Sequence, residues 1–236
     1  MTVVTRLCLS LCLLLGGCAS VPENLVAPST LPTLAEGKPK PGVHVSVSHY
    51  YGSPLPHLLA ASMKDTEYGN DAKVMRNLGA QSPLAPAERQ RNTTQIVRQV
   101  LSETALFEHV AMNDEPLRPG DYQLHLRLYT YWPLDGGGAL GSLGTLLTFG
   151  LFPSSRPEEF KLLMALQGPD QKPLGGLANS DAIDQRVGLV NLARLGDTQE
   201  KAEYDTLKRQ VDALLLRVVK GGLIPELVQV PAGGRG

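Results

Sequence analysis

Residues 121–132 read Asp121-Tyr122-Gln123-Leu124-His125-Leu126-Arg127-Leu128-Tyr129-Thr130-Tyr131-Trp132, a regular alternation of two kinds of side chain. Successive side chains of a β-strand point to opposite faces, so this period of two predicts a strand. One face would carry Tyr122, Leu124, Leu126, Leu128 and Thr130, and the other Gln123, His125, Arg127, Tyr129 and Tyr131. We expect the leucine face to be buried against another layer. Tyr129 to Trp132 would pack the sheet or line a ligand groove, and packing is the preferred interpretation.

Further elements are predicted on both sides of this strand. Strands are expected at 42–50, 159–167 and 172–186, the last two joined by a turn beginning with Gly168-Pro169-Asp170, and another begins near 107–110. Apolar side chains at helical spacing predict helices over 86–106 and about 198–220. This order predicts an α+β fold, with a mostly antiparallel sheet and two long helices packed on one face.

The second helix carries start and stop signals. Asp197 is a candidate N-cap with Glu200 three residues later, and Gly221-Gly222 provides a C-terminal stop. Its charged side chains are interpreted most simply as a solvated face: Glu203, Lys208, Arg209 and Arg217.

The first helix and the residues after it carry a family resemblance. The segment Val97-Arg98-Gln99-Val100-Leu101-Ser102-Glu103-Thr104-Ala105-Leu106-Phe107-Glu108-His109-Val110 is similar to the helix-to-strand signature of domains related to the TolB N-terminal domain. It also resembles the auxiliary lipoproteins of lipid-transport ABC systems and the curli-type secretion lipoproteins. The resemblance covers about 43–170 and rests on apolar positions. It implies a small α+β module for protein–protein contact in the cell envelope.

The N-terminal segment has the layout of a secretory signal. Arg6 supplies a positive charge, and residues 7–15 are apolar except for Ser10, which is too short a run to span a bilayer. The stretch that follows, Leu15-Gly16-Gly17-Cys18, resembles the bacterial lipobox. The resemblance implies cleavage between Gly17 and Cys18 and a lipid anchor, palmitate included, on Cys18. The alternative is an ordinary signal peptide with a chance cysteine.

The rest of the chain divides accordingly. Residues 1–17 would be the signal peptide, 18–42 the lipidated cysteine and a proline-rich tether, 43–230 one periplasmic domain, and 231–236 a disordered tail. Ala19 follows the cysteine; under the sorting rule of enteric lipoproteins, the absence of aspartate there implies the outer membrane. The chain would then face the periplasm.

Composition agrees with an exported globular protein. The chain is 42% hydrophobic and 19% charged. Cys8 and Cys12 would leave with the signal, so Cys18 is the one cysteine that remains and no disulfide is expected. The net charge of −1 and the lack of a basic tract argue against nucleic acid as a partner.

Between Asp135 and Arg156 the chain has no charged residue. Its apolar part, 139–152, is too short to cross a bilayer as a helix. Three interpretations stay open: a buried linker helix, shallow insertion into a membrane leaflet, or a contact surface for a partner or a second copy. The candidate contact residues are Leu140, Leu143, Leu146, Leu147, Phe149, Leu151 and Phe152. The match Gly136-x-Gly138-x-x-Gly141 lacks the βαβ context that a dinucleotide site requires.

Residues for catalysis or metal binding are not found in a usable pattern. No pair of histidines has a helical metal spacing, and His44 and His49 would lie on opposite faces of their strand. The chain lacks the Gly-x-Ser-x-Gly of a nucleophile elbow. The carboxylate pairs Asp181/Asp184 and Glu158/Glu159 are interpreted as turn or surface groups. We expect no enzyme activity, no cofactor and no metal.

The sequence therefore favours a membrane-anchored periplasmic lipoprotein that acts as a non-enzymatic accessory or interaction module. Its partners would be the membrane, through the lipid on Cys18, and another envelope protein or itself. The alternative is a lipid- or small-apolar-ligand-binding envelope protein that uses 136–153 as a lid or membrane contact. The sequence leaves the partner, the pathway and the oligomeric state open.

Overall fold

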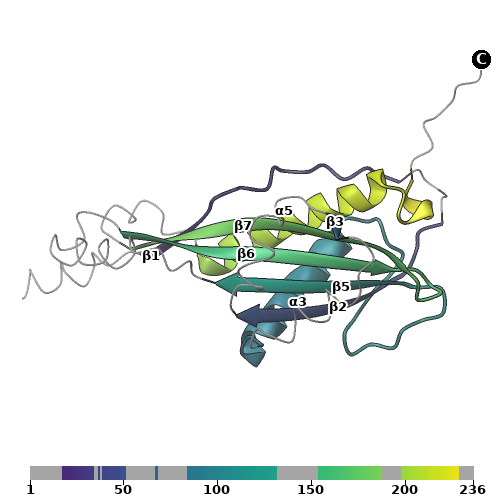
Figure 1. Ribbon diagram of the computed structural model, residues 1–236, viewed down its shortest axis with the longest axis horizontal. Coiled ribbons are helices and arrows are strands. Elements are labelled where there is room, and N and C mark those ends of the chain that lie inside the picture. The colour runs from purple at the N-terminus through teal and green to yellow at the C-terminus, as the bar shows by residue number, and fades with distance from the viewer. Residues whose placement is uncertain are drawn as a thin grey trace, which may run out of the picture. The chain divides into compact units, whose positions relative to one another are not determined.

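The computed structural model describes residues 18–34, 37, 39–51, 67–68, 84–131, 154–187 and 198–228. Within these residues the strands are β1 Cys18–Pro22, β2 Val43–Tyr51, β3 Glu67–Tyr68, β4 Val110–Met112, β5 Tyr122–Tyr131, β6 Ser154–Gln167 and β7 Pro173–Val187. The helices are α3 Ala87–Glu103, α5 Gln199–Lys220 and the short 3-10 helix η2 Pro225–Leu227. Strands and helices together give an α+β fold (Figure 1).

The sheet order is β1-β7-β6-β5-β2-β4, with β3 paired to β7. β2 lies between β4 and β5 and runs parallel to both, whereas β1 and β3 are antiparallel to β7. The sheet is therefore mixed, and the prediction of a mostly antiparallel sheet was wrong. Alternation along a strand reports which face is covered, and it does not report the direction of the neighbouring strand.

The described residues form two compact units. The first contains 18–23, 154–159, 182–187 and 198–206, and the second contains the described parts of 24–131, 160–181 and 207–228.

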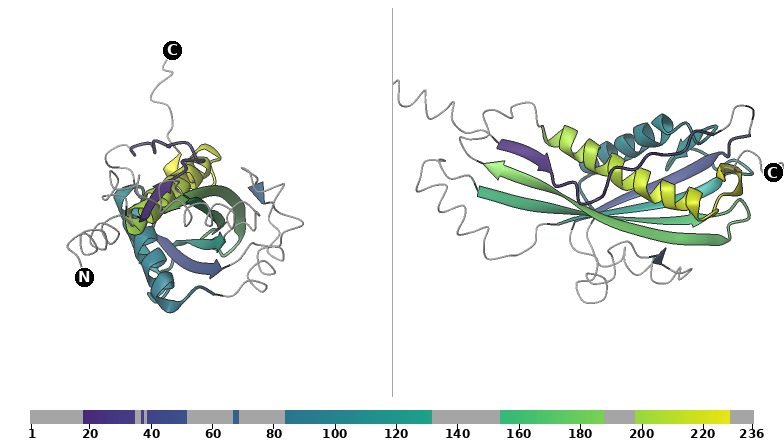
Figure 2. Two further views of the ribbon diagram at one scale, coloured as in Figure 1. Left: turned by 90° about the vertical axis from the view of Figure 1, so that its left-hand side faces the viewer. Right: turned by 90° about the horizontal axis from the view of Figure 1, so that it is seen from above.

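In the second unit, α3 and the later part of α5 cover one face of the sheet (Figure 2). Beneath them lies an aliphatic core in which each buried side chain contributes roughly 1.5–3 kcal/mol. It is made by Val43, Val45, Val47, Val97, Val100, Leu101, Leu124, Leu126, Leu128, Phe160, Leu162, Met164, Val211, Leu214, Leu215 and Val218, all at most 4% exposed. The predicted leucine face of residues 122–130 is confirmed as this core layer, as is the packing of both helices on one side.

The residues that begin and end the two long helices are ones that favour helix ends. Pro86 directly precedes α3. At the start of α5, Thr198 Oγ1 accepts a hydrogen bond from the backbone N–H of Lys201, with 3.2 Å between N and Oγ1. Thr198 therefore takes the capping role that the sequence assigned to Asp197, which lies outside the described residues. At the other end Gly222 adopts a φ of +65°, and Leu223 N–H donates to Val218 O, so the double-glycine stop is confirmed.

Two side-chain amides close the outer edge of β2 beyond the short β4 pairing. Asn113 accepts from Val47 N–H and donates to Val47 O, at 2.6 and 3.1 Å. Gln90 does the same for His49, at 3.0 and 2.7 Å. An amide group presents a donor and an acceptor as a peptide does, so these residues stand in for a further strand. They protect an edge that could otherwise pair with another chain.

We expect the double variant Gln90→Ala/Asn113→Ala to lose about 1 kcal/mol of unfolding free energy for each lost hydrogen bond. It should also self-associate through the freed edge. Urea unfolding and sedimentation velocity measure the two effects. Gln99→Ala is the control, because Gln99 is exposed and its side chain donates to Glu103 within the same helix. A double variant as stable and as monodisperse as the control would contradict the role of these amides.

Candidate functional sites

Cys18, the predicted lipidation site, is the first residue of β1. β1 pairs antiparallel with β7, with Cys18 opposite Val187, and Ala19 is 2% exposed. The backbone pairing extends to Glu23, whose N–H donates to Ala182 O at 2.8 Å. Residues 18–23 are therefore part of a sheet, which differs from the loose start of a tether that the prolines suggested. Gly17 and the rest of the predicted signal lie outside the described residues.

The chain after β1 is also held to the domain. Leu25 N–H donates to Asp181 Oδ1 at 3.0 Å, while the Leu25 side chain is 63% exposed. Asp181 Oδ2 in turn accepts from Arg209 Nη2 at 2.9 Å, and the Asp181 side chain is fully buried. Arg209 is thus an ion-pair partner and lies outside the solvated face to which the sequence assigned it. Arg217, also assigned there, donates to Ala178 O at 3.4 Å.

Three of the four paired carboxylates, Glu158, Asp181 and Asp184, are buried and are not the surface groups that the sequence suggested, whereas Glu159 is partly exposed. Asp184 is buried and bonds to Arg186 Nε at 2.7 Å, and Glu158 is buried and accepts from Gln185 Nε2 at 3.0 Å. Each of these carboxylates has its own donor. The arrangement is that of structural ion pairs and hydrogen bonds, without two carboxyl groups facing one substrate position.

His49 is the centre of a buried polar cluster between β2, β5 and α3. Its two ring nitrogens lie 2.9 Å from Thr93 Oγ1 and 2.9 Å from Thr130 Oγ1. Burial, reinforced by the positive charge of Arg89, lowers the pKa of His49 to about 4. The imidazole is therefore neutral at pH 7 and serves as a hydrogen-bonding element of the core. His44 points to the other face, where Nε2 lies 3.0 Å from Glu115 O, as the strand period predicted.

The face of β2 and β5 opposite the helices, hereafter the second face, faces the viewer in Figure 1. The parallel register sets Ser46 opposite His125 and Tyr50 opposite Tyr129. Ser46 Oγ lies 2.6 Å from His125 Nδ1, and the two tyrosine rings stack with centroids 5.1 Å apart. Burial lowers the pKa of His125, and the positive charge of Arg127 acts in the same direction. Burial raises the pKa of Tyr129 to about 12, although the charge of Arg127 opposes this shift. Both groups are therefore neutral at pH 7.

The aromatic cluster around Tyr129 combines packing with polar contacts. Lys161 Nζ lies 5.0 Å from the centroid of the Tyr131 ring, in a cation–π arrangement. Tyr129 is fully buried, which confirms the packing interpretation for that residue. Trp132, the last member of the predicted cluster, lies outside the described residues.

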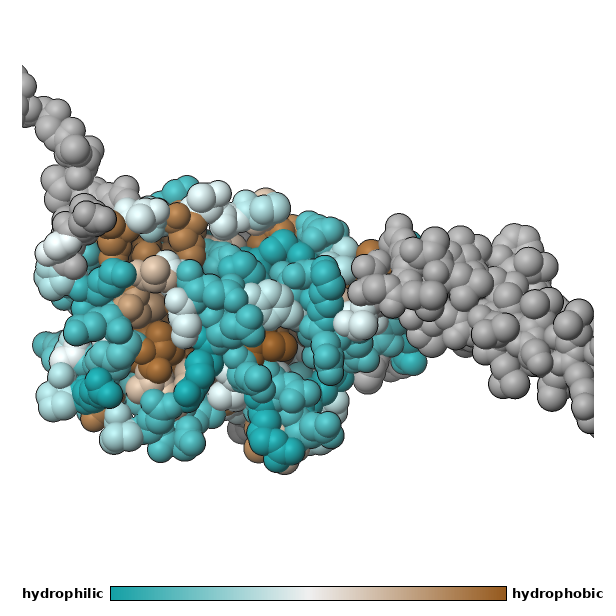
Figure 3. Space-filling model, turned by 180° about the vertical axis from the view of Figure 1, so that it is seen from behind, coloured by the Kyte–Doolittle hydropathy of each residue, from teal (hydrophilic) through white to brown (hydrophobic). Residues whose placement is uncertain are grey.

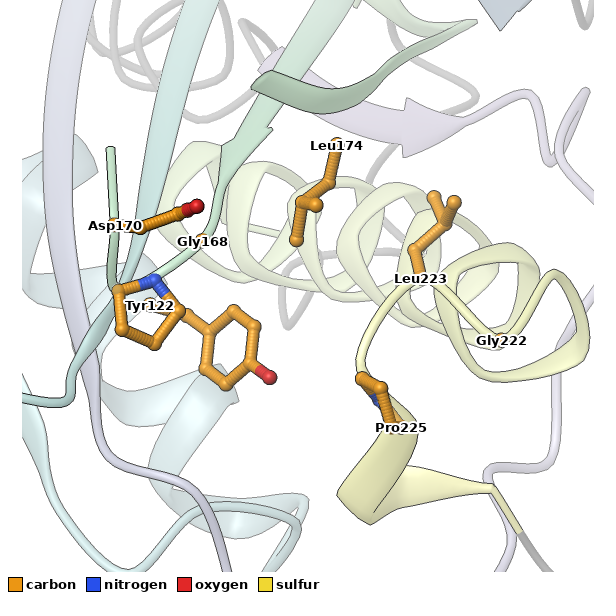
Figure 4. Close-up of a pocket in the computed structure, with 8 residues that line it drawn as sticks. Tyr122, Gly168, Asp170, Leu174, Gly222, Leu223 and Pro225 are labelled. Carbon is orange, nitrogen blue, oxygen red and sulfur yellow. The ribbon is translucent and has the colours of Figure 1, made fainter. Parts of the chain in front are cut away.

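A shallow pocket of about 340 Å³ lies at the other end of β5, beside the turn between β6 and β7 (Figure 4). Its lining consists of Tyr122, Gly168, Pro169, Asp170, Leu174, Gly222, Leu223 and Pro225. Tyr122 Oη donates to Glu226 Oε2 at 2.8 Å; burial and this carboxylate raise the pKa of Tyr122 to about 12. Because the Tyr122 hydroxyl keeps its proton and already donates it to Glu226, the pocket lining presents mainly apolar surface. Sequence reasoning missed it, since its members come from three distant segments.

The predicted membrane or partner contact, Leu140, Leu143, Leu146, Leu147, Phe149, Leu151 and Phe152, lies outside the described residues. Among the residues that are described, no helix is long and apolar enough to cross a membrane. No group of three His, Cys, Asp or Glu side chains in this part of the chain could hold a metal ion. Seen from the helix side, the described surface is mostly hydrophilic, with hydrophobic residues in patches (Figure 3).

No protein-family model and no curated protein sequence matches this chain. Among solved structures, it is similar to protein XCC0632 from Xanthomonas campestris, of the DUF330 family model, with 10% identity and a TM-score of 0.34. That alignment covers 80% of this chain and 90% of the other. It is also similar to PelC from Paraburkholderia phytofirmans, solved as a dodecamer in two crystal forms, with 10% and 11% identity and a TM-score of 0.31. These alignments cover 85% of this chain and 96% of PelC.

Proposed function

We propose that the chain is a lipid-anchored accessory protein of the bacterial cell envelope, held at the outer membrane by an acylated Cys18 and facing the periplasm. The observation that carries the proposal is the position of Cys18, which ends a lipobox-like sequence and begins a strand of the sheet. Three acyl chains, as the lipobox resemblance implies, would hold a protein permanently, since two are enough for stable anchoring.

The pairing of β1 with β7 determines how closely the anchored residue is joined to the folded domain. Because residues 18–22 are hydrogen bonded to β7, the acylated residue would be joined to the sheet without a flexible spacer. The first unit would then be held close to the membrane surface. We infer that the domain acts there by contact with another envelope protein or with a second copy of itself, without catalysis.

Replacement of Cys18 by alanine tests the anchor. In cells labelled with radioactive palmitate, we expect the wild-type chain to carry the label and the Cys18→Ala variant to lose it. The intact mass of the wild-type protein should correspond to a chain that begins at an acylated Cys18, whereas the variant should keep residues 1–17. Separation of the inner and outer membranes by density then places the wild-type protein.

Cys12→Ala is the matched control, because Cys12 lies within the segment that cleavage removes and its loss should leave labelling and mass unchanged. Label retained in Cys18→Ala, or a mature wild-type chain that begins at another residue, would refute the anchor. Recovery of the wild-type protein with the inner membrane would refute only the outer-membrane assignment.

A further inference from the structure

The two halves of α3 are held on the sheet in different ways. The buried apolar side chains of this helix, Val97, Val100 and Leu101, all lie in its second half. In the first half the buried side chain is that of Thr93, which is polar. Apolar burial therefore holds the second half of the helix, whereas polar contacts hold its first two turns.

His49 is the residue of β2 to which the first half of α3 is joined. Gln90 accepts from the His49 backbone N–H at 3.0 Å and donates to the His49 carbonyl at 2.7 Å. Just before the helix, the Ala85 N–H donates to the same carbonyl at 2.9 Å. Thr93 Oγ1 lies 2.9 Å from Nδ1 of the His49 ring. The backbone and the side chain of one residue thus hold this part of the helix in place.

The hydroxyl groups around His49 decide which ring nitrogen carries the proton. Thr93 Oγ1 donates its one hydrogen to Arg89 O at 2.9 Å, so it accepts a hydrogen bond from His49 Nδ1–H. Nε2 is then the unprotonated nitrogen and accepts from Thr130 Oγ1, also at 2.9 Å. A second proton has to bind at Nε2, where it would face the Thr130 hydrogen. Protonation therefore disrupts this hydrogen bond and places a charge on a residue that is 1% exposed.

The charged and titratable groups next to His49 do not compensate such a charge. α3 contributes Arg89, whose Nη1 donates to Tyr51 Oη at 3.1 Å. β2 contributes Tyr51, whose ring lies edge-on to the His49 ring with 5.7 Å between centroids, and β5 contributes the uncharged Thr130 hydroxyl. Glu88, the acidic residue in the first turn of α3, is exposed. Among the described residues no carboxylate hydrogen bonds to His49, so a charged imidazole would meet the positive charge of Arg89.

We propose that His49 is an acid-sensitive contact: its protonation releases residues 85–94 from β2, while the second half of α3 stays packed on the sheet. Release removes Ala85 and Gln90 from the outer edge of β2 and exposes the backbone N–H and C=O of His49 there. Unpaired groups of this kind allow a strand edge to bind another extended segment. Acid would thus uncover an edge that is closed at neutral pH. The proposal does not depend on the acylation of Cys18.

Hydrogen exchange measured by mass spectrometry on the full-length chain in a non-ionic detergent tests this proposal. The pKa of His49 is about 4 when burial and Arg89 act on the ring and about 6.5 when the ring is exposed. The closed form is therefore favoured above pH 6.5 and loses this advantage as the pH falls to 4. After correction for the intrinsic exchange rate, we expect the protection of residues 87–94 to be about 100-fold lower at pH 4 than at pH 7. Peptides from 160–166 in β6 and 211–218 in α5 should remain protected at labelling times at which 87–94 has exchanged fully.

His49→Gln cannot take up the proton, so the protection of residues 87–94 should be the same at both pH values, whatever its level. Gln99→Ala, at an exposed position on α3, is the control and should respond to pH as the wild type does. The proposal is overturned if 87–94 keeps its protection at pH 4, or loses it together with 160–166 and 211–218, which would be global unfolding. It is also overturned if His49→Gln shows the same loss as the wild type. If this variant fails to fold, the wild-type comparison of 87–94 with the two core peptides decides alone.

Discussion

Replacement of Asp181 by alanine is expected to lower the free energy of unfolding by about 3–5 kcal/mol, because it removes the buried carboxylate that pairs with the largely buried charge of Arg209. The Asp181 side chain is 0% exposed and that of Arg209 is 13% exposed, so water can compensate little of the loss. Leu25 N–H also loses its acceptor. For a chain of this size the melting temperature should fall by roughly 10 °C.

Circular dichroism during heating and urea unfolding measure this change. Asp170→Ala is the matched control, since Asp170 pairs with Lys172 at the surface, where both side chains are more than half exposed. We expect no measurable shift in its melting temperature. A double variant, Asp181→Leu/Arg209→Met, should recover much of the lost stability, because an apolar pair avoids the burial of charge. An Asp181→Ala protein that melts with the wild type would show that this ion pair does not stabilise the fold.

The second large effect is a loss of stability in mild acid through His49. Its pKa is about 4 in the folded chain and about 6.5 when unfolded, so between these values the unfolded chain binds the extra proton. The contribution of His49 is therefore fully present above pH 6.5 and is lost as the pH falls towards 4. Integrated over this window, the difference is about 3 kcal/mol.

Urea unfolding at several pH values between 4 and 8 tests this expectation. His49→Gln should be less stable than the wild type at pH 7 and should show a smaller decrease of stability with acid. Gln99→Ala, at an exposed position on α3, is the control and should keep the wild-type slope. Equal slopes in the wild type and His49→Gln would contradict the assignment.

The period of the side chains predicted the two long helices and the long strands of the sheet, but not β1 or β3. The alternation in residues 122–131 and the helical stripes of 87–103 and 199–220 arise from burial of one face, and that pattern is local in sequence. The turn at Gly168 and the stop at Gly221-Gly222 were equally visible, because only backbone conformation decides them.

What the sequence alone determined is thus the two long helices, the strands other than β1 and β3, and the buried leucine face, together with the expectation of an anchor at Cys18. Only the tertiary structure decided that β2 runs parallel to both neighbours, that Asp181 pairs with Arg209, and that Tyr50 stacks on Tyr129. A side-chain pattern records burial, whereas strand direction and the partners of buried charges depend on residues brought together from distant parts of the chain. Asp181 looked like a surface carboxylate because its partner comes 28 residues later, on α5.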